Sequence, residues 1–211
     1  MSNLATFSTI VEKVNKYQND YDLETSSLAF EWLALQSILD LNDDEIEDSI
    51  TDGSMDGGID AIKIIDRDVH VFNFKYTDSF EKTDNNFPEN EIDKIVVTMD
   101  RIYSKSINPK DVNAVLWERI QEIWELFEKG SLNFKYYLCS NKKKPAEHAI
   151  RKFETALDKY RFVEYFYYDQ DDIVSRILEK KYNKISGNIR FVDKQYFDRS
   201  DGALKGVVAT V

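Results

Sequence analysis

The sequence is short of cysteine and histidine, and this shortage limits the chemistry it can support. Of its 211 residues, one is cysteine (Cys139) and two are histidine (His70 and His148). A single cysteine excludes an internal disulfide framework, and three such residues cannot complete a cysteine and histidine zinc site within one chain. Any metal ion that the chain holds by itself must therefore bind to oxygen ligands.

Long hydrophobic runs are also missing. The stretch from Ala203 to Val211 is interrupted by Lys205, and it is far shorter than the roughly 20 residues of a transmembrane helix. The N-terminus has neither a basic leader nor a continuous apolar segment, so we expect no secretory signal. With 42% hydrophobic and 32% charged residues, the composition is that of a globular protein, which we expect to be cytoplasmic and without membrane contact.

Basic residues are scarce in the first half of the chain. The net charge is -11, and the first 100 residues carry 7 Lys and Arg against 23 Asp and Glu. No basic residue lies between Lys16 and Lys63. This balance argues against a surface that binds nucleic acid through basic charge alone. Such an acidic surface is either a solvated face or a binding site for a divalent cation. A bound cation would relieve the repulsion between the acids and let the surface approach an anion.

Hydrophobic periodicity predicts a mixed α/β fold. Residues 25–40 place Leu28, Trp32 and Leu35 on one stripe of a helix, and two β-branched runs on either side of Asp66-Arg67 predict a β-hairpin. This alternation predicts a mixed sheet covered by helices on its faces. In chain order we predict a helix (25–40), three strands (46–50, 58–65 and 69–76), a helix (90–104), a helix from Asn108-Pro109 to Gly130, a strand (132–139), a helix (145–160), a strand (161–168) and a helix (171–181).

Two regions are expected. Residues 1–185 form one domain, and residues 186–211 read as a β-hairpin tail with a turn at DRSDG. Because the tail ends on the apolar segment GVVATV, which would expose a sticky strand edge, we expect it to be the start of a C-terminal region that is absent from this chain.

The predicted hairpin gathers polar side chains at one end of an apolar surface. With a loop at Asp66-Arg67, Asp60 lies opposite Asn73, and Lys75 shares their face. An unpaired charge at such a position is costly, so we expect Asp60 and Lys75 to pair or to hold a ligand. Glu31 falls inside the apolar stripe of helix 25–40. It either joins the same site, or lies at the edge of the stripe and reaches solvent or caps a neighbouring backbone group.

A second kind of metal site is also open at this point. DGSMDGGIDAIK partly fits a calcium EF-hand loop, with Asp52, Ser54 and Asp56 in the first ligand positions. The twelfth position is Lys63 rather than a bidentate Glu, and a β-branched run follows where a helix should begin.

Three segments carry a resemblance to a known family. FEWLAL, DGSMDGGIDAI and VFNFKY resemble the motifs of Mrr-type restriction nucleases of the PD-(D/E)XK fold, and more closely those of the N-terminal domain of abortive-infection phage-resistance (AIPR) proteins. The likeness covers about residues 28 to 77. It implies a restriction-endonuclease-like core of order α-β-β-β-α-β with extra helices, and a magnesium-dependent or manganese-dependent endonuclease in bacterial phage defence.

The resemblance also implies roles for individual residues. Asp60 and Glu31 would be metal ligands, Asp56 a further ligand, and Lys75 the catalytic lysine. Asn73 stands where the family has an acid or Gln, and its amide oxygen can ligate a hard cation but brings no negative charge. This departure keeps open a second function, a nuclease-fold module that binds nucleic acid or a partner protein with weak or no cleavage.

The basic second half of the chain offers contacts for a nucleic acid, expected to be DNA. The basic residues that are candidates for these contacts cluster at the start of the helix predicted from Pro145. Backbone amide groups at a helix end would add to their attraction for a phosphate. The alternative is a solvated lysine loop. The pattern leaves a homodimer open, and a scaffolding protein without a nucleic-acid role is a third possibility. The predicted nucleic-acid contacts are Lys142, Lys143, Lys144, Arg151 and Lys152.

Overall fold

The computed structural model describes residues 3–181, 196–201 and 204–209, and the chain divides into two units, Met1–Lys181 and Tyr182–Val211. The division falls a few residues before the predicted boundary at 185. The first unit is the predicted mixed α/β fold. Its helices and strands are α1 (Leu4–Asp20), α2 (Ser26–Leu39), α3 (Asp43–Ser49), β1 (Ala61–Ile65), β2 (Asp68–Lys75), the short 3₁₀ helix η1 (Glu81–Asp84), α4 (Glu89–Tyr103), α5 (Ala114–Glu128), β3 (Asn133–Ser140), α6 (Glu147–Leu157), β4 (Val163–Tyr168) and α7 (Gln170–Lys181).

A four-stranded sheet of order β1-β2-β3-β4 forms the centre of this unit. β1 and β2 are antiparallel, whereas β2, β3 and β4 are parallel to one another, so the sheet is mixed as predicted. The hairpin pairs Ala61 with Phe72 and Ile65 with Asp68, which confirms the predicted Asp66-Arg67 loop. Because β2, β3 and β4 run the same way, their carboxyl ends meet at one edge of the sheet, where α/β proteins commonly place ligands.

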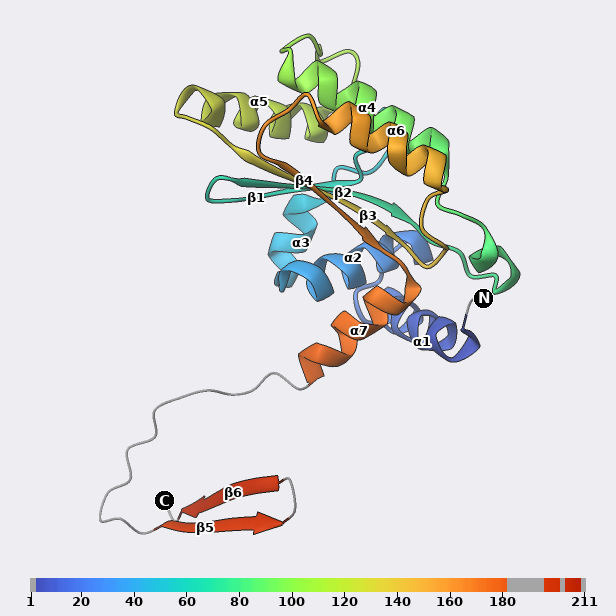
Figure 1. Cartoon of the computed structure of the whole chain (residues 1–211), viewed down its shortest axis with the longest axis vertical. Coiled ribbons are helices and arrows are strands. Elements are labelled where there is room, and N and C mark those ends of the chain that lie inside the picture. The colour runs from blue at the N-terminus through green and yellow to red at the C-terminus, as the bar shows by residue number, and fades with distance from the viewer. Residues whose placement is uncertain (1–2, 182–195, 202–203, 210–211) are drawn as a thin grey trace. The chain divides into compact units, whose positions relative to one another are not determined.

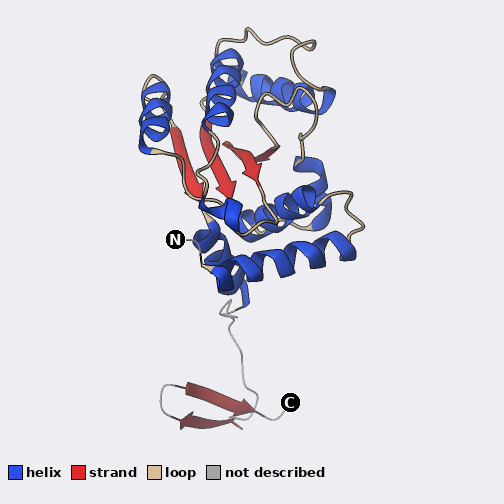
Figure 2. Cartoon of the chain, turned by 90° about the vertical axis from the view of Figure 1, so that its right-hand side faces the viewer, coloured by secondary structure: helices blue, strands red, loops and turns tan. Residues whose placement is uncertain are grey.

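Helices lie on both sides of the sheet (Figure 2), and Figure 1 shows α4, α5 and α6 on one side and α1, α2, α3 and α7 on the other. Alternate residues of β2 point to opposite faces, as the pleat of a strand requires. Val69 and Val71 join the core beneath α4, α5 and α6. Phe72 and Phe74 join the core beneath α1, α2 and α7. α2 packs against α1, α7 and β2, so most of its surface is buried rather than one stripe alone.

The predicted strand at residues 46–50 is wrong, because this segment belongs to helix α3. Asn42 and Glu45 form a capping box, in which the Asn42 side chain accepts the backbone N–H of Glu45 and the Glu45 side chain accepts that of Asn42. The box satisfies two amide groups that would otherwise lack partners, and three acids in the first turn add to the stability of the helix. Only Ile50 keeps a strand-like contact, an isolated bridge to Ala61.

Two other boundaries differ from prediction. The helix expected to begin at Asn108-Pro109 begins at Ala114, with Asn113 as its N-cap. Asn108 instead lies in a turn, where its backbone N–H donates to Asp111. Helix α1 was not predicted at all, although it supplies Ile10 and Val14 to the core.

The tail contains the predicted hairpin, described here by itself. Strands β5 (Tyr196–Asp201) and β6 (Leu204–Ala209) pair antiparallel. The predicted turn DRSDG is too wide, because Asp198 to Asp201 belong to β5. The last part of that turn lies outside the described residues.

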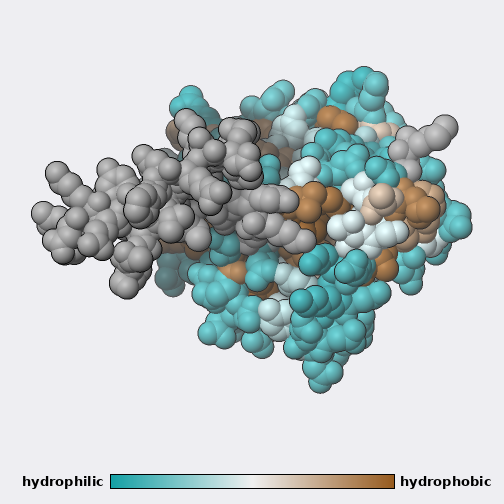
Figure 3. Space-filling model, turned by 90° about the horizontal axis from the view of Figure 1, so that it is seen from below, coloured by the Kyte–Doolittle hydropathy of each residue, from teal (hydrophilic) through white to brown (hydrophobic). Residues whose placement is uncertain are grey.

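The surface is mostly hydrophilic on the face shown in Figure 3, where hydrophobic side chains form small separate groups. Over the described residues, no helix combines the length and the apolar character that crossing a membrane requires.

Candidate active site

A cavity of about 180 Å³ opens where α2, the loop after α3 and the end of β2 meet. Glu31, Asp52, Asp60 and Lys75 supply the charged groups of its wall, while the remaining wall is largely aromatic and includes Tyr76. Since one water occupies roughly 30 Å³, the cavity has room for a cation with several water ligands. Glu31, Asp60 and Lys75, predicted from the sequence to belong to one site, therefore share one cavity.

Asp60 and Lys75 form an ion pair at the end of the hairpin. Lys75 Nζ lies 3.6 Å from Asp60 Oδ2, and the same oxygen accepts the backbone N–H of Phe74 at 2.6 Å. Asp60 is only 4% exposed. Burial raises the pKa of Asp60 from 3.8 to about 7, against the opposing effects of Lys75 and the Phe74 hydrogen bond. A group poised near neutral pH in a cavity is typical of functional sites.

Glu31 is the second buried acid. It lies within α2 and is 4% exposed, and its Oε2 has no hydrogen-bond partner. Burial raises the pKa of Glu31 well above its ordinary value, and the negative charges of Asp60 and Asp52 raise it further. Because a buried carboxylate without a partner is costly, a cation in the cavity would stabilise both Glu31 and Asp60.

Lys75 has a second carboxylate partner that the sequence did not reveal. Glu91 of α4 lies 3.4 Å from Lys75 Nζ and also accepts from Lys94 at 2.9 Å. Burial alone would raise the pKa of Glu91, but Lys94 and Lys75 together lower it below its ordinary value. Lys75 is therefore held between two acids from different elements, which limits the positions its ammonium can take.

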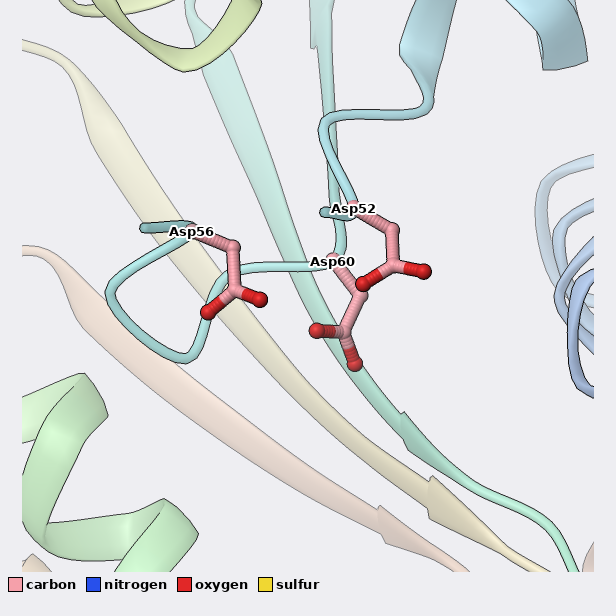
Figure 4. A group of neighbouring side chains, drawn as sticks. All are labelled: Asp52, Asp56 and Asp60. Atoms are coloured by element: carbon pink, nitrogen blue, oxygen red, sulfur yellow. The ribbon is translucent and has the colours of Figure 1, made fainter. Parts of the chain in front are cut away.

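A third group of acids comes from the loop between α3 and β1. Carboxylate oxygens of Asp52, Asp56 and Asp60 all lie within 4.8 Å of one another, and Figure 4 shows the three side chains side by side. Among the described residues this is the one cluster of three or more such groups close enough to share a metal ion. The EF-hand alternative is wrong, because the loop leads into β1 and Lys63 lies within that strand.

Two glycines let this loop pack closely against α4. Gly57 and Gly58 both have positive φ, of +65° and +79°. A Cβ added at Gly58 would lie 2.9 Å from the Lys94 Cβ, and the Gly57 carbonyl accepts from Thr98 Oγ1 at 2.8 Å. Both the positive φ and the close approach favour glycine at these two positions.

Asn73 does not belong to the wall of the cavity. Its side-chain Nδ2 donates to the Gly58 carbonyl at 3.0 Å, while its Oδ1 is buried without a hydrogen-bond partner. Asn73 therefore connects β2 to the loop between α3 and β1 (residues 50–60), called the acidic loop below. Its predicted role as a metal ligand finds less support in the structure than the roles of Asp60 and Glu31.

Four of the five predicted nucleic-acid contacts are ion-paired with acids of the chain itself. Lys143 pairs with Asp84, Lys144 with Asp169 and Asp172, Lys152 with Asp93 and Glu89, and Arg151 with Glu147. Lys142 has no such partner among the described residues and lines a small polar cavity with Asn141 and Gln170. The basic residues are thus interleaved with acids rather than grouped as a bare positive patch.

Asn113, which precedes α5, anchors the acidic loop through Thr51. The Asn113 Nδ2 donates to the Thr51 carbonyl at 2.8 Å, and its Oδ1 accepts the Leu116 N–H at 2.8 Å as the N-cap of α5. We expect Asn113→Ala to lower the free energy of unfolding by about 2–3 kcal/mol, because the helix loses its cap and a buried carbonyl loses its donor. Urea denaturation measures this change.

The control for this anchor is Asn108→Ala. Asn108 lies in an exposed turn of the same connection, and among the described residues its hydrogen bonds join it to nearby Asp111 alone. Its removal should cost less than about 1 kcal/mol. Equal effects of the two substitutions would contradict the anchoring role of Asn113.

The remaining reactive side chains lie outside the cavity. Cys139 is fully buried, and burial raises the pKa of its thiol well above the ordinary value. His70 is hydrogen-bonded to Tyr137 at 3.0 Å, and burial lowers the pKa of His70. His148 pairs with Glu89.

Comparison with known proteins adds no assignment, since no family model, no curated protein and no solved structure matches this chain.

Proposed function

We propose that this chain is a metal-dependent nuclease of the PD-(D/E)XK type that hydrolyses phosphodiester bonds of DNA in bacterial phage defence. One observation carries the proposal: a lysine ammonium, a buried aspartate and a buried, unpartnered glutamate line one small cavity at the end of a β-hairpin. The phage-defence role and the choice of DNA come from the resemblance to AIPR proteins over residues 28 to 77.

The residues present fit a hard divalent cation. The available donors are carboxylate oxygens, which Mg²⁺ and Mn²⁺ prefer. Burial raises the pKa of both Glu31 and Asp60, and a cation beside them would favour their charged forms. Glu31 and Asp60 would hold the ion, with Asp56 beside them. Such an ion, when bound, lowers the pKa of a water ligand and neutralises charge that develops on a phosphate.

The protein groups then have separate tasks. Lys75 can donate a hydrogen bond to a phosphate oxygen or to the attacking water, and its contact with Glu91 keeps its ammonium near the carboxylate of Asp60. The aromatic rings of Phe30 and Tyr76, stacked at 5.2 Å, form part of the apolar wall of the cavity. Lys142 is the best placed of the predicted basic residues to contact a phosphate, because it alone has no ion-pair partner among the described residues.

The direct test is cleavage of plasmid DNA by the purified full chain. We expect nicked or linear products with Mg²⁺ or Mn²⁺ and none with a chelator, with single-stranded DNA and RNA assayed in parallel to define the substrate. Absence of cleavage with every substrate and both metals would contradict the proposal.

A binding module without cleavage is the second candidate, and Asn73 favours it because this residue brings no charge to the site. Salt-dependent retention of DNA without cleavage would support that candidate. If the chain neither retains nor cleaves DNA, that result would favour a scaffolding protein.

A further inference from the structure

The residue at position 73 does not supply the acid that this kind of site needs. Asn73 donates its amide to the Gly58 carbonyl at 3.0 Å and lies outside the wall of the cavity. A phosphodiester carries a negative charge, and a divalent cation that approaches it is usually held by one or two carboxylates. The question is therefore which carboxylate, besides Glu31, can accompany Asp60.

Asp52 has the position and the freedom to do so. It lines the same cavity as Glu31 and Asp60, and one of its oxygens lies within 4.8 Å of ligand atoms of both Asp56 and Asp60 (Figure 4). Within the described part of the chain, no hydrogen bond or ion pair involves the Asp52 carboxylate. Asp56, in contrast, already accepts the Gly58 N–H at 2.6 Å. Asp52 can therefore bind a cation without breaking a contact.

The backbone holds Asp52 next to Asp60 although eight positions separate them in sequence. Ile50 forms a bridge to Ala61, and the Thr51 N–H donates to the Asp60 carbonyl at 2.8 Å. The Thr51 hydroxyl also donates to the Ile59 carbonyl at 2.8 Å. These contacts close the base of the loop, so the residue after Thr51 must emerge beside Asp60.

A separate observation points to a ligand at this place. Glu31, on a different element, is 4% exposed, and its Oε2 has no hydrogen-bond partner. It lines the cavity that Asp52 and Asp60 share. Lys75 is the one basic residue in the wall of that cavity, so three carboxylates face a single ammonium. A divalent cation would offset the remaining negative charge.

We infer that Asp52 is a further carboxylate ligand of the divalent cation, beside Asp60 and Glu31, and supplies from the loop the charge that strand position 73 lacks. This inference rests on the proposed function, because it assigns a residue to the metal of the same site. It places the ligands on α2, on the loop after α3 and at the start of β1, and it gives Asn73 the task of positioning the loop.

The test is Mn²⁺ binding by the full chain, measured by electron paramagnetic resonance of free Mn²⁺ and by titration calorimetry, without DNA. We expect the wild-type chain to bind Mn²⁺ and Asp52→Asn to bind it at least tenfold more weakly. Asp52→Asn should fold normally, since the side chain is exposed and has no partner to lose. Thermal melting in chelator checks this point.

The matched control is Glu47→Gln, which removes the same charge from an exposed position of α3 outside the cavity. We expect its Mn²⁺ affinity to stay within twofold of wild type. If Asp52→Asn binds Mn²⁺ as tightly as wild type, or no more weakly than Glu47→Gln, the inference about Asp52 fails while the proposed nuclease stands. If the wild-type chain binds no Mn²⁺ and cleaves nothing, the proposed function itself fails.

Discussion

Replacing Lys75 by Met is expected to slow DNA cleavage by about 10²–10³-fold, the usual loss when a group that stabilises developing charge is removed. The Lys75 ammonium lies 3.6 Å from Asp60 and 3.4 Å from Glu91, so it is the positive group that a phosphate in the cavity would meet. Met preserves most of the side-chain volume but carries no charge. Initial rates of plasmid cleavage at saturating Mg²⁺ measure the loss.

The chain offers a close control for this substitution. Lys94 bonds to the other oxygen of Glu91 at 2.9 Å but forms no ion pair with Asp60. Lys94→Met therefore disturbs Glu91 without removing the ammonium from the cavity, and its cleavage rate should stay within about tenfold of wild type. Circular dichroism confirms that both variants are folded. A Lys75→Met enzyme as active as Lys94→Met would show that the lysine takes no part in the reaction.

Asp60→Asn is expected to abolish metal-dependent cleavage and, at the same time, to stabilise the metal-free fold at neutral pH. The amide oxygen of Asn can still accept the Phe74 N–H, so the local structure is kept. The buried charge, however, is removed. Loss of activity with gain of stability is typical of a residue that is retained for function at a cost to folding.

The sign of this stability change follows from the raised pKa of Asp60, about 7 in the folded protein against 3.8 ordinarily. Between these two values the folded chain keeps a proton that the unfolded chain releases. Raising the pH from about 4 to about 7 therefore favours unfolding, and the loss levels off above that range. A rise of this size in the pKa of Asp60 lowers the free energy of unfolding by at most about 4 kcal/mol.

Urea denaturation in chelator at pH 5 and pH 8 measures this effect. Wild type should be less stable at pH 8, and Asp60→Asn should lose part of that difference; Glu31, whose pKa is also raised by burial, accounts for a remainder. Asp78→Asn changes an exposed carboxylate and should keep the wild-type difference. If Asp60→Asn shows the same pH dependence as wild type, Asp60 is not the buried acid that the structure indicates.

Local pattern was enough to predict the hairpin and the pairing of its residues. A strand alternates its side chains strictly, so the Asp66-Arg67 loop places Lys75 near Asp60, and the structure confirms this register. The buried position of Glu31 was one of two alternatives, because helical periodicity shows only which stripe a residue occupies. The position of α2 beside β2 and the loop after α3 decided it, because Glu31 lines the cavity between them.

Two wrong predictions have identifiable causes, one local and one tertiary. Ile46 and Ile50 alternate with polar residues, which resembles a short strand, but the capping box of Asn42 and Glu45 was a readable sign that a helix begins there. Asn108-Pro109 carries a helix-start signal, yet the N-cap lies five positions later at Asn113, whose side chain also anchors Thr51. A tertiary contact thus selected between two possible caps.

Sequence alone determined the mixed α/β class, the hairpin and the meeting of Asp60 with Lys75, because strand and helix periods are properties of a short stretch of chain. It could not determine that Glu91 would contact Lys75, that Asp52 would lie beside Asp60, or that Asn73 would turn to Gly58. Those three contacts depend on how α4 packs on the sheet and how the loop after α3 closes. Tertiary structure decided them, since side chains far apart in the chain meet only when the buried surfaces between them have packed.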